Sequence, residues 1–146
     1  MTDSSTELNA ANLNKFLAAD GTTGGGGGTG HACWGLRIRY TGAAWEAYAD
    51  YGAESQISNV GLTWDGSNHW LTIDLSGCDN TFENYPVVLC TQTSAASVIY
   101  NINAYATAAS SVRVTFFAYD DAGIADRITT EATSMDFNIL FFGQIG

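Results

Sequence analysis

The chain has 146 residues, which fits a single domain large enough to bury a core without disulfide bonds. Charged residues make up only 14% of the chain, well below the usual share of about 25%, and 46% of the residues are hydrophobic. The formal net charge of −10 argues against nucleic acids and anionic membrane surfaces as partners, because binding to either depends on Lys and Arg. No apolar run reaches the length of about 18 residues that a membrane span needs, so membrane insertion is not expected.

Residues 1–20 carry the only helical pattern in the chain. Ser4 and Glu7 have the spacing of a capping box, in which both side chains satisfy backbone N–H groups of the first helical turn. An isolated helix of this length is marginal in water, so it would order only against another surface. We predict a helical or extended attachment segment, with a frayed tail as the alternative. The side chains assigned to attachment are Leu8, Leu13, Phe16 and Leu17.

Residues 21–30 read Gly-Thr-Thr-Gly-Gly-Gly-Gly-Gly-Thr-Gly and mark the clearest boundary in the chain. Such a run has high conformational freedom and behaves as a flexible linker. It lacks the Gly-Lys-Ser/Thr ending of a phosphate-binding loop, so no nucleotide site is expected. The first residues have neither the basic region nor the apolar stretch of a signal peptide, which favours folding in a cytosol. We therefore expect an attachment segment (1–20), a linker (21–30) and a head domain (31–146).

From residue 31 onward, short segments of alternating polar and apolar residues predict β-strands. Asp65-Gly66-Ser67-Asn68 is a strong hairpin-turn signal, and the only proline, Pro86, opens a strand, where its missing N–H costs little. No helical pattern separates these segments, which predicts an all-β antiparallel sandwich, specifically a jelly roll. Residues 120–133 are expected to form a long loop. The expected strands are 34–40, 44–50, 57–64, 69–75, 86–91, 98–105, 112–119 and 134–142.

The last expected strand has two different faces. One face is apolar throughout, whereas the other starts polar, at Asp136 and Asn138, and ends apolar. A strand with one solvated face alternates along its whole length, so we expect the end of this strand to be covered on both sides by a partner sheet, a partner subunit or both. We predict that it forms the interface of a homotrimer. The residues assigned to that interface are Phe137, Ile139, Leu140, Phe141 and Phe142.

The sequence contains no recognisable catalytic motif. His31 and His69 are the only histidines, neither lies in a His-Glu-x-x-His motif, and there is no Gly-x-Ser-x-Gly elbow. We predict that the protein is not an enzyme. Cys33, Cys78 and Cys90 form no Cys-x-x-Cys pair, which argues against zinc binding or thioredoxin-like redox chemistry. They are expected to be small buried thiols, with one Cys78–Cys90 disulfide as the alternative.

The expected loop 120–133 collects acidic side chains. Asp120, Asp121 and Asp126 lie near Glu131 in the sequence, and carboxylate oxygens on a loop are ligands suited to calcium. Their spacing matches no known calcium loop, so we prefer to interpret them as solvated acids, one of them paired with Arg127. No metal and no cofactor are predicted.

Aromatic side chains give the best indication of a binding surface. A sugar site combines aromatic faces with planar polar groups that pair with hydroxyls, and Trp70, Tyr85, Tyr105 and Tyr119 project opposite the apolar rows. Tyr and Trp are also enriched at subunit interfaces, which is the preferred interpretation of Trp70 and Tyr105. Tyr119, with the loop that follows it, is the leading candidate for receptor contact. The residues assigned to receptor binding are Tyr119, Asp120, Asp121, Asp126 and Arg127.

Several stretches resemble the C-terminal heads of bacteriophage fibres and spikes, which are similar to the trimeric jelly rolls of C1q and TNF domains. The opening ELNAANLN, residues 7–14, is similar to the segments with which virion appendages begin. The resemblance extends over roughly residues 34–143 and is one of pattern, without a shared set of functional residues. The stretches that carry it are 41–46 (TGAAWE), 62–74 (LTWDGSNHWLTID), 85–88 (YPVV), 112–121 (VRVTFFAYDD) and 136–143 (DFNILFFG).

This resemblance implies a viral structural protein, assembled in the host cytoplasm and located on the virion as a tail fibre, spike or head fibre. Its N-terminal segment would dock on other virion proteins of the capsid or tail, and its head would bind a glycan or protein of the host surface. One alternative is a capsid decoration or cement protein that binds capsid subunits and no receptor. Another is a secreted lectin-like module, against which the absence of a signal peptide counts.

Overall fold

The computed structural model describes residues 30–52, 59–78, 81–93, 98–119 and 122–145. The predicted attachment segment, all but the last residue of the glycine linker, and Asp120 and Asp121 lie outside these residues. The described part of the chain forms nine strands. They are β1 (Gly30–Tyr40), β2 (Trp45–Tyr51), β3 (Gly61–Asp65), β4 (Trp70–Asp74), β5 (Val87–Gln92), β6 (Asn101–Ala108), β7 (Ser111–Tyr119), β8 (Ala125–Arg127) and β9 (Asp136–Ile145).

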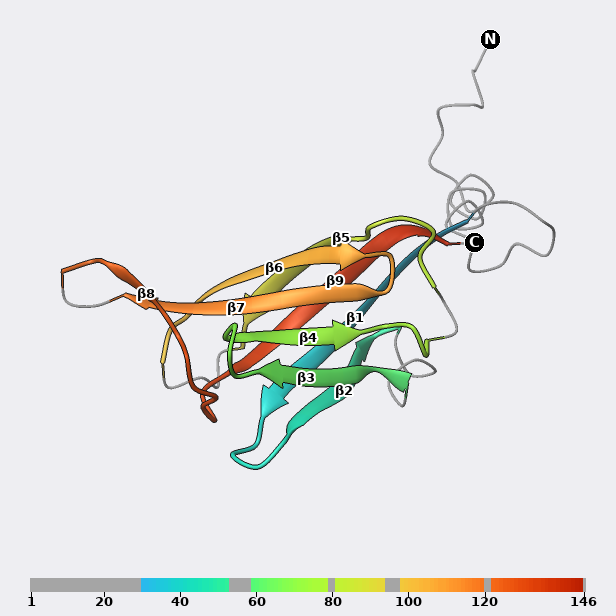
Figure 1. The fold of residues 1–146 in the computed structure, drawn as a ribbon. Helices are drawn as coiled ribbons and strands as arrows, with labels where there is room; N and C mark the ends of the chain where they lie inside the picture. The colour runs from blue at the N-terminus through green and yellow to red at the C-terminus, as the bar shows by residue number, and fades with distance from the viewer. Residues whose placement is uncertain (1–29, 53–58, 79–80, 94–97, 120–121, 146) are drawn as a thin grey trace, which may run out of the picture.

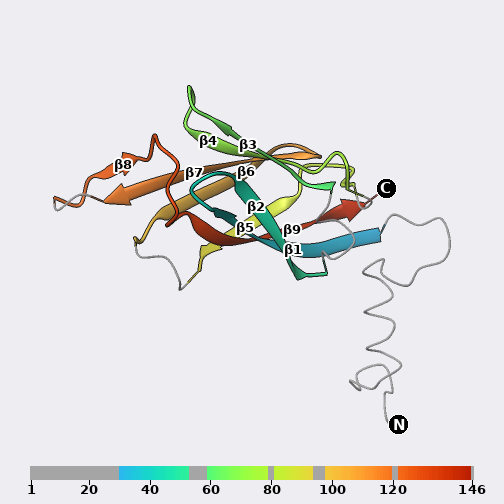
Figure 2. The ribbon, with the colours of Figure 1, turned by 90° about the horizontal axis from the view of Figure 1, so that it is seen from below.

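The strands build two antiparallel sheets that lie face to face (Figures 1 and 2). Sheet A has the strand order β2-β1-β9-β5, and sheet B has the order β3-β4-β7-β6. The short strand β8 pairs with β7 along the same edge as β4. The two sheets contact each other through β5 and β6 at one side and through β2 and β3 at the other. The predicted all-β, antiparallel class is confirmed.

Strand β9 lies in the middle of sheet A, between β1 and β5. Met135, just before it, and Phe137, Ile139 and Phe141 within it are all buried, as the period-two pattern predicted. They face the inner side chains of sheet B, so the core lies between the two sheets. The buried hydrophobic residues that sheet B contributes from β4 and β7 are Leu71, Ile73, Val112, Val114 and Phe116.

Aromatic contacts hold the core together. Phe137 of β9 meets Phe116 of β7 edge to face, with 5.5 Å between ring centroids, and so joins the two sheets. Trp45 of β2 lies 6.1 Å from the same Phe116 ring. Within sheet A, the Trp34 and Phe141 rings are 4.8 Å apart. Each such pair is worth about 0.5–1.5 kcal/mol beyond the area it buries, so these rings fix how the sheets pack.

An ion pair closes the polar beginning of β9. Arg37 of β1 donates hydrogen bonds from Nε to Oδ1 of Asp136, at 2.9 Å, and from Nη2 to Oδ2, at 2.5 Å. This bidentate pair explains why the Asp136 carboxylate is tolerated where it is largely buried. The Arg37 hydrogen bonds also hold the pKa of Asp136 below its ordinary value.

The hairpin between β3 and β4 follows the predicted turn. Oδ1 of Asp65 accepts hydrogen bonds from the backbone N–H groups of Ser67, at 2.9 Å, and Asn68, at 2.8 Å. The N–H of His69 donates to the Asp65 carbonyl at 2.7 Å, and His69 has a left-handed φ of 56°. This local chemistry returns the chain so that Asp65 pairs with Trp70. The turn prediction is confirmed.

The expected loop 120–133 is not one continuous loop, because β8 lies inside it. Arg127 pairs with Phe117 of β7, and the next backbone N–H, at Ile128, donates to the Phe116 carbonyl at 2.8 Å. Farther on, the Glu131 carboxylate accepts a hydrogen bond from Nε1 of Trp45 at 2.5 Å. All three residues of β8 are exposed, so the sequence shows no hydrophobic alternation from which this strand could be predicted. It is recognised only by its pairing with β7.

The three cysteines, all within the described ranges, form no disulfide, and they differ in exposure. Cys78 is buried, as predicted, and Cys90 is half-buried. The prediction of a buried thiol is wrong for Cys33, which is exposed because it lies on the outer face of sheet A between the buried residues Ala32 and Trp34. The alternative of a Cys78–Cys90 disulfide is not realised.

Candidate functional site

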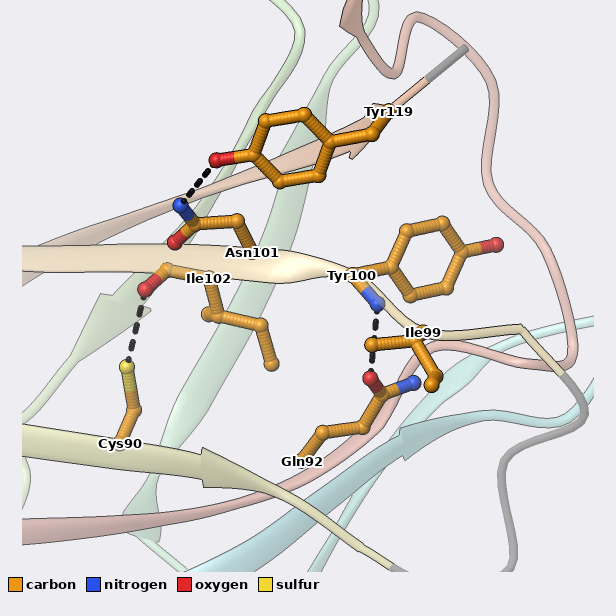
Figure 3. A pocket seen from close by; sticks show the side chains of 7 residues that line it. All are labelled: Cys90, Gln92, Ile99, Tyr100, Asn101, Ile102 and Tyr119. Carbon is orange, nitrogen blue, oxygen red and sulfur yellow. Dashed lines mark hydrogen bonds between the residues drawn. The ribbon is translucent and has the colours of Figure 1, made fainter. Parts of the chain in front are cut away.

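The predicted receptor residue Tyr119 borders a hollow of about 390 Å³ at the side of the sandwich where β5 and β6 meet (Figure 3). Strand β5 belongs to sheet A and β6 to sheet B, so the hollow marks the seam between the two sheets. Its volume falls in the range of about 300–1,000 Å³ that is usual for small-molecule sites. The lining residues are Cys90, Gln92, Ile99, Tyr100, Asn101, Ile102 and Tyr119.

The polar groups on the β5 side of the hollow are engaged within the protein. Oε1 of Gln92 accepts a hydrogen bond from the Tyr100 N–H at 2.7 Å, and Nε2 of Gln92 donates to the Val98 carbonyl. The Cys90 thiol donates to the Ile102 carbonyl at 3.6 Å, and burial raises the pKa of this thiol. A neutral, hydrogen-bonded thiol is a poor nucleophile, so this side of the hollow is structural.

The outer rim of the hollow, in contrast, presents groups to solvent. Nδ2 of Asn101 donates to the Tyr119 hydroxyl at 3.2 Å, and the Tyr119 side chain remains 59% exposed (Figure 3). Ile99 is also exposed, but it lines the hollow on the Gln92 side (Figure 3). An aromatic ring with a planar amide matches the surface of a sugar, which has both apolar C–H faces and hydroxyls. The rim can therefore position a small polyhydroxylated group.

The structure places the other described residues predicted for receptor binding on β8, which pairs with the end of β7. Ala125 of β8 pairs with Tyr119 and Arg127 pairs with Phe117, so Asp126 and Arg127 lie at the edge of β7 opposite to Asn101. The Arg127 guanidinium lies over the Trp70 ring, 5.9 Å from its centroid, and has no carboxylate within 4.0 Å among the described residues. The preferred interpretation, in which Arg127 pairs with a loop acid, therefore finds no support in the described part of the chain.

Sequence reasoning missed Asn101, whose side-chain amide donates a hydrogen bond to the Tyr119 hydroxyl. Asn101 pairs with Phe117 across the β6–β7 hairpin, two residues from Tyr119 on the same face. Regular counting outward from the two-residue turn at 109–110 would have placed Asn101 opposite Ala118, because the sequence does not reveal the irregularity between Ala106 and Ala108 that shifts the register by one residue. The strand was also expected to end at Tyr105, and it runs on to Ala108.

The residues predicted for the trimer interface divide between the two faces of β9. Phe137, Ile139 and Phe141 are buried in the core of the single chain, so they offer no surface to another subunit. Leu140 and Phe142 point the other way, onto the outer face of sheet A, and Phe142 is 47% exposed. A predicted subunit contact through β9 is thus confined to these two residues and their neighbours on that face.

Strand β5 extends this outer face with two further apolar residues. Val87 pairs with Phe142 and Leu89 pairs with Leu140, so the four side chains lie together. Val87 is 57% exposed and Leu89 is 61% exposed. We call this set, Val87, Leu89, Leu140 and Phe142, the apolar patch. The alternation within β5 was visible in the sequence, but its position beside β9 was not.

A shallow hollow of about 290 Å³ adjoins the apolar patch. It lies over Gly35 of β1, which pairs with Leu140 and has no side chain to cover the sheet. Leu89 and Leu140 form its apolar walls, and Thr91 and Asn138 add polar groups. The outer face of sheet A therefore has both protruding apolar side chains and a recess that can receive one.

The described residues include neither a metal-binding cluster nor a membrane-spanning helix. Within these ranges no three His, Cys, Asp or Glu side chains lie close enough to hold a metal ion. His69 is committed to the hairpin turn, where its Nδ1 atom is buried without a hydrogen-bond partner. In the same part of the chain, no helix has the length and apolar character of a membrane span. The attachment residues Leu8, Leu13, Phe16 and Leu17 lie outside the described ranges.

The sequence matches no protein-family model, and neither the curated proteins nor the solved structures give a significant match. A function for this chain therefore has to be inferred from the geometry of its two sheets and from the pattern of its sequence.

Proposed function

We propose that this chain is a trimeric appendage of a virus particle, docked by its N-terminal segment and carrying a jelly-roll head that binds the host surface. The observation that carries the proposal is the apolar patch on the outer face of sheet A. A solvated outer face normally carries polar side chains, whereas this face has exposed Val87, Leu89 and Phe142 together. A contiguous exposed apolar patch is typical of a protein–protein contact.

The pairing of the strands supports the jelly-roll assignment. Strand β1 pairs with β9. Strands β4 and β7, which lie between β1 and β9 in the sequence, pair with each other. Strands β5 and β6 lie inside both pairs in the sequence and sit in different sheets. Nested antiparallel pairs of this kind arise when one long hairpin is rolled into two sheets, which is the principle of a jelly roll.

The energetics favour burial of the apolar patch by a second copy. Full burial of a Val, Leu or Phe side chain is worth about 1.5–3 kcal/mol, so covering the exposed half of each gives about 1 kcal/mol per residue. Three copies arranged around an axis would bury the patch of every subunit. The threefold order and the virion location come from the resemblance to fibre and spike heads, and the glycine run at 21–30 would connect the head to its attachment segment.

The proposal is tested by placing a charge in the patch. Leu89→Asp should convert the full-length trimer into a folded monomer, because an unpaired carboxylate buried between subunits costs several kcal/mol. Ile124→Asp is the matched control, since Ile124 has the same 61% exposure as Leu89 but lies in the β7–β8 connection, away from sheet A. Sedimentation velocity at micromolar concentration gives the oligomeric state, and circular dichroism checks folding.

A monomeric wild-type chain, or a Leu89→Asp variant that remains trimeric, would reject assembly through this face. The location is tested separately, by immunogold labelling of the source particle viewed by electron microscopy. Binding of the head to empty capsids without binding to host cells would identify a capsid decoration protein in place of a receptor-binding appendage.

A further inference from the structure

The ring of Trp70, the first residue of β4, has two arginines within cation–π distance on the outer face of sheet B. The Arg113 guanidinium of β7 is 4.1 Å from the centroid of the Trp70 ring, and that of Arg127 is 5.9 Å away. Arg113 points outward because its neighbours Val112 and Val114 point into the core. Trp70 begins β4 on the same edge of β7 where β8 ends. We call Trp70, Arg113 and Arg127 the arginine cluster.

The two arginines of this cluster differ from the other arginines in having no anionic partner among the described residues. Arg37 is paired with Asp136, and Arg39 lies 3.4 Å from the Glu46 carboxylate. Within the described ranges, Arg113 and Arg127 have no carboxylate within 4.0 Å. Two like charges near one ring repel each other, and an anion bound beside them reduces that repulsion. In a chain with a net charge of −10, two neighbouring arginines without a close carboxylate among the described residues are a distinct feature.

Two acids lie near the cluster by strand register, Asp74 on β4 and Asp65 on β3, and neither has a carboxylate oxygen within 4.0 Å of a guanidinium nitrogen of Arg113 or Arg127. Asp65 is paired with Trp70 across the β3–β4 hairpin. Its two carboxylate oxygens accept hydrogen bonds from the Ser67 and Asn68 N–H groups and from the Asn68 amide, and these bonds lower the pKa of Asp65. The carboxylate is thus used to hold the turn, and the guanidinium groups remain available for a ligand.

An amide and a phenol lie on the same face of sheet B as the cluster. Asn101 pairs with Phe117, which pairs with Arg127, so these three side chains form one row across sheet B. Tyr105 pairs with Arg113 in a second row and is exposed. A guanidinium fork bound by a carboxylate or phosphate, with an amide and a phenol at its sides, provides partners for both the charge and the hydroxyls of a charged sugar.

We propose that the arginine cluster binds a saccharide carrying a carboxylate or phosphate group. The anionic group would accept hydrogen bonds from Arg113 and Arg127, which both lie near the Trp70 ring, and the sugar hydroxyls would pair with Asn101 and Tyr105. Two cations are too few for a nucleic acid, whose binding depends on many phosphate contacts. The inference deepens the receptor-binding part of the proposed function and rests on it only for the biological source of the saccharide.

The test measures binding of defined probes to the full-length protein by isothermal titration calorimetry. Oligogalacturonate supplies carboxylates, its methyl ester supplies the same backbone without charge, and a phosphorylated oligomannose supplies phosphates. At least one of the two anionic probes should bind, more weakly at high salt, and the ester should not. Which of them binds identifies the anionic group, and either result supports the proposal.

Variants then locate the binding. Arg113→Gln should weaken it about 10-fold, and the Arg113→Gln/Arg127→Gln double variant about 100-fold, because each removes a charge-assisted hydrogen bond. Arg39→Gln is the matched control: Arg39 also lies over an aromatic ring, 4.8 Å from the centroid of Tyr48, but is already paired with Glu46. It should change affinity less than about twofold. Near-ultraviolet circular dichroism checks that each variant is folded. The single variant Arg127→Gln gives the contribution of Arg127 at an exposed position, where the substitution removes no buried contact.

The proposal is overturned if neither anionic probe binds, if the ester binds equally well, or if the double variant binds like the wild type. Polyglutamate serves as the competing class of ligand. If polyglutamate binds as tightly as the anionic saccharides, and loses affinity in the same Arg113 and Arg127 variants, the cluster is a surface for acidic polypeptides instead. Calorimetric binding is measured independently of the oligomeric state given by sedimentation. Failure of the trimer proposal and failure of the saccharide proposal can therefore be told apart.

Discussion

The adjacent residues Phe141 and Phe142 provide the sharpest test of how β9 divides the molecule into core and outer face. Phe141 is fully buried against Trp34, whereas Phe142 is 47% exposed. Phe141→Ala removes a ring from the core and should lower the free energy of unfolding by about 3–5 kcal/mol. Phe142→Ala loses only the buried half of a side chain whose full burial is worth about 1.5–3 kcal/mol, so the loss should be about 1 kcal/mol.

The comparison should be made in the Leu89→Asp background, where assembly is expected to be absent and each chain unfolds alone. Urea unfolding followed by tryptophan fluorescence gives both free energies, and an unchanged m-value shows that the same surface is exposed in each variant. In the wild-type background the Phe142→Ala loss should grow with protein concentration, because the assembled state buries the exposed half. Equal losses for the two substitutions in the Leu89→Asp background would refute the assignment of these residues to opposite faces.

Two further predictions concern β9 and the N-terminal segment. The lowered pKa of Asp136 means that its ion pair stabilises the folded state fully above the unfolded-state pKa of about 3.9 and progressively less as pH falls below it. Asp136→Asn should therefore lower the free energy of unfolding by about 1.5–3 kcal/mol at pH 7 and flatten the dependence of that free energy on pH between 5 and 2. Urea denaturation at a series of pH values measures both effects. If the slope of stability against pH is the same as in the wild type, the acid sensitivity belongs to other groups. Deleting residues 1–28 should leave the thermal midpoint of the head unchanged while abolishing incorporation into particles, and a large fall in that midpoint would show that the segment packs on the head.

Periodicity in the sequence was enough to establish the all-β class and the inward side chains of β9. Met135, Phe137, Ile139 and Phe141 alternate strictly, and alternation depends only on the geometry of a single strand. The β3–β4 turn was equally accessible, because Asp65 makes its hydrogen bonds to residues two and three positions later. Both features are local, and local chemistry is written directly in the order of the residues.

The composition of the two candidate surfaces was decided by the tertiary structure. Periodicity tells which side a residue faces, but it does not tell which strand lies beside it. The apolar patch exists because β9 is placed beside β5, which brings Leu89 to Leu140 although they are far apart in the sequence. The arginine cluster exists because β4 and β8 share one edge of β7, so that Trp70, Arg113 and Arg127 come from three strands. Such pairings are set by packing of the whole core, and no short stretch of sequence contains them.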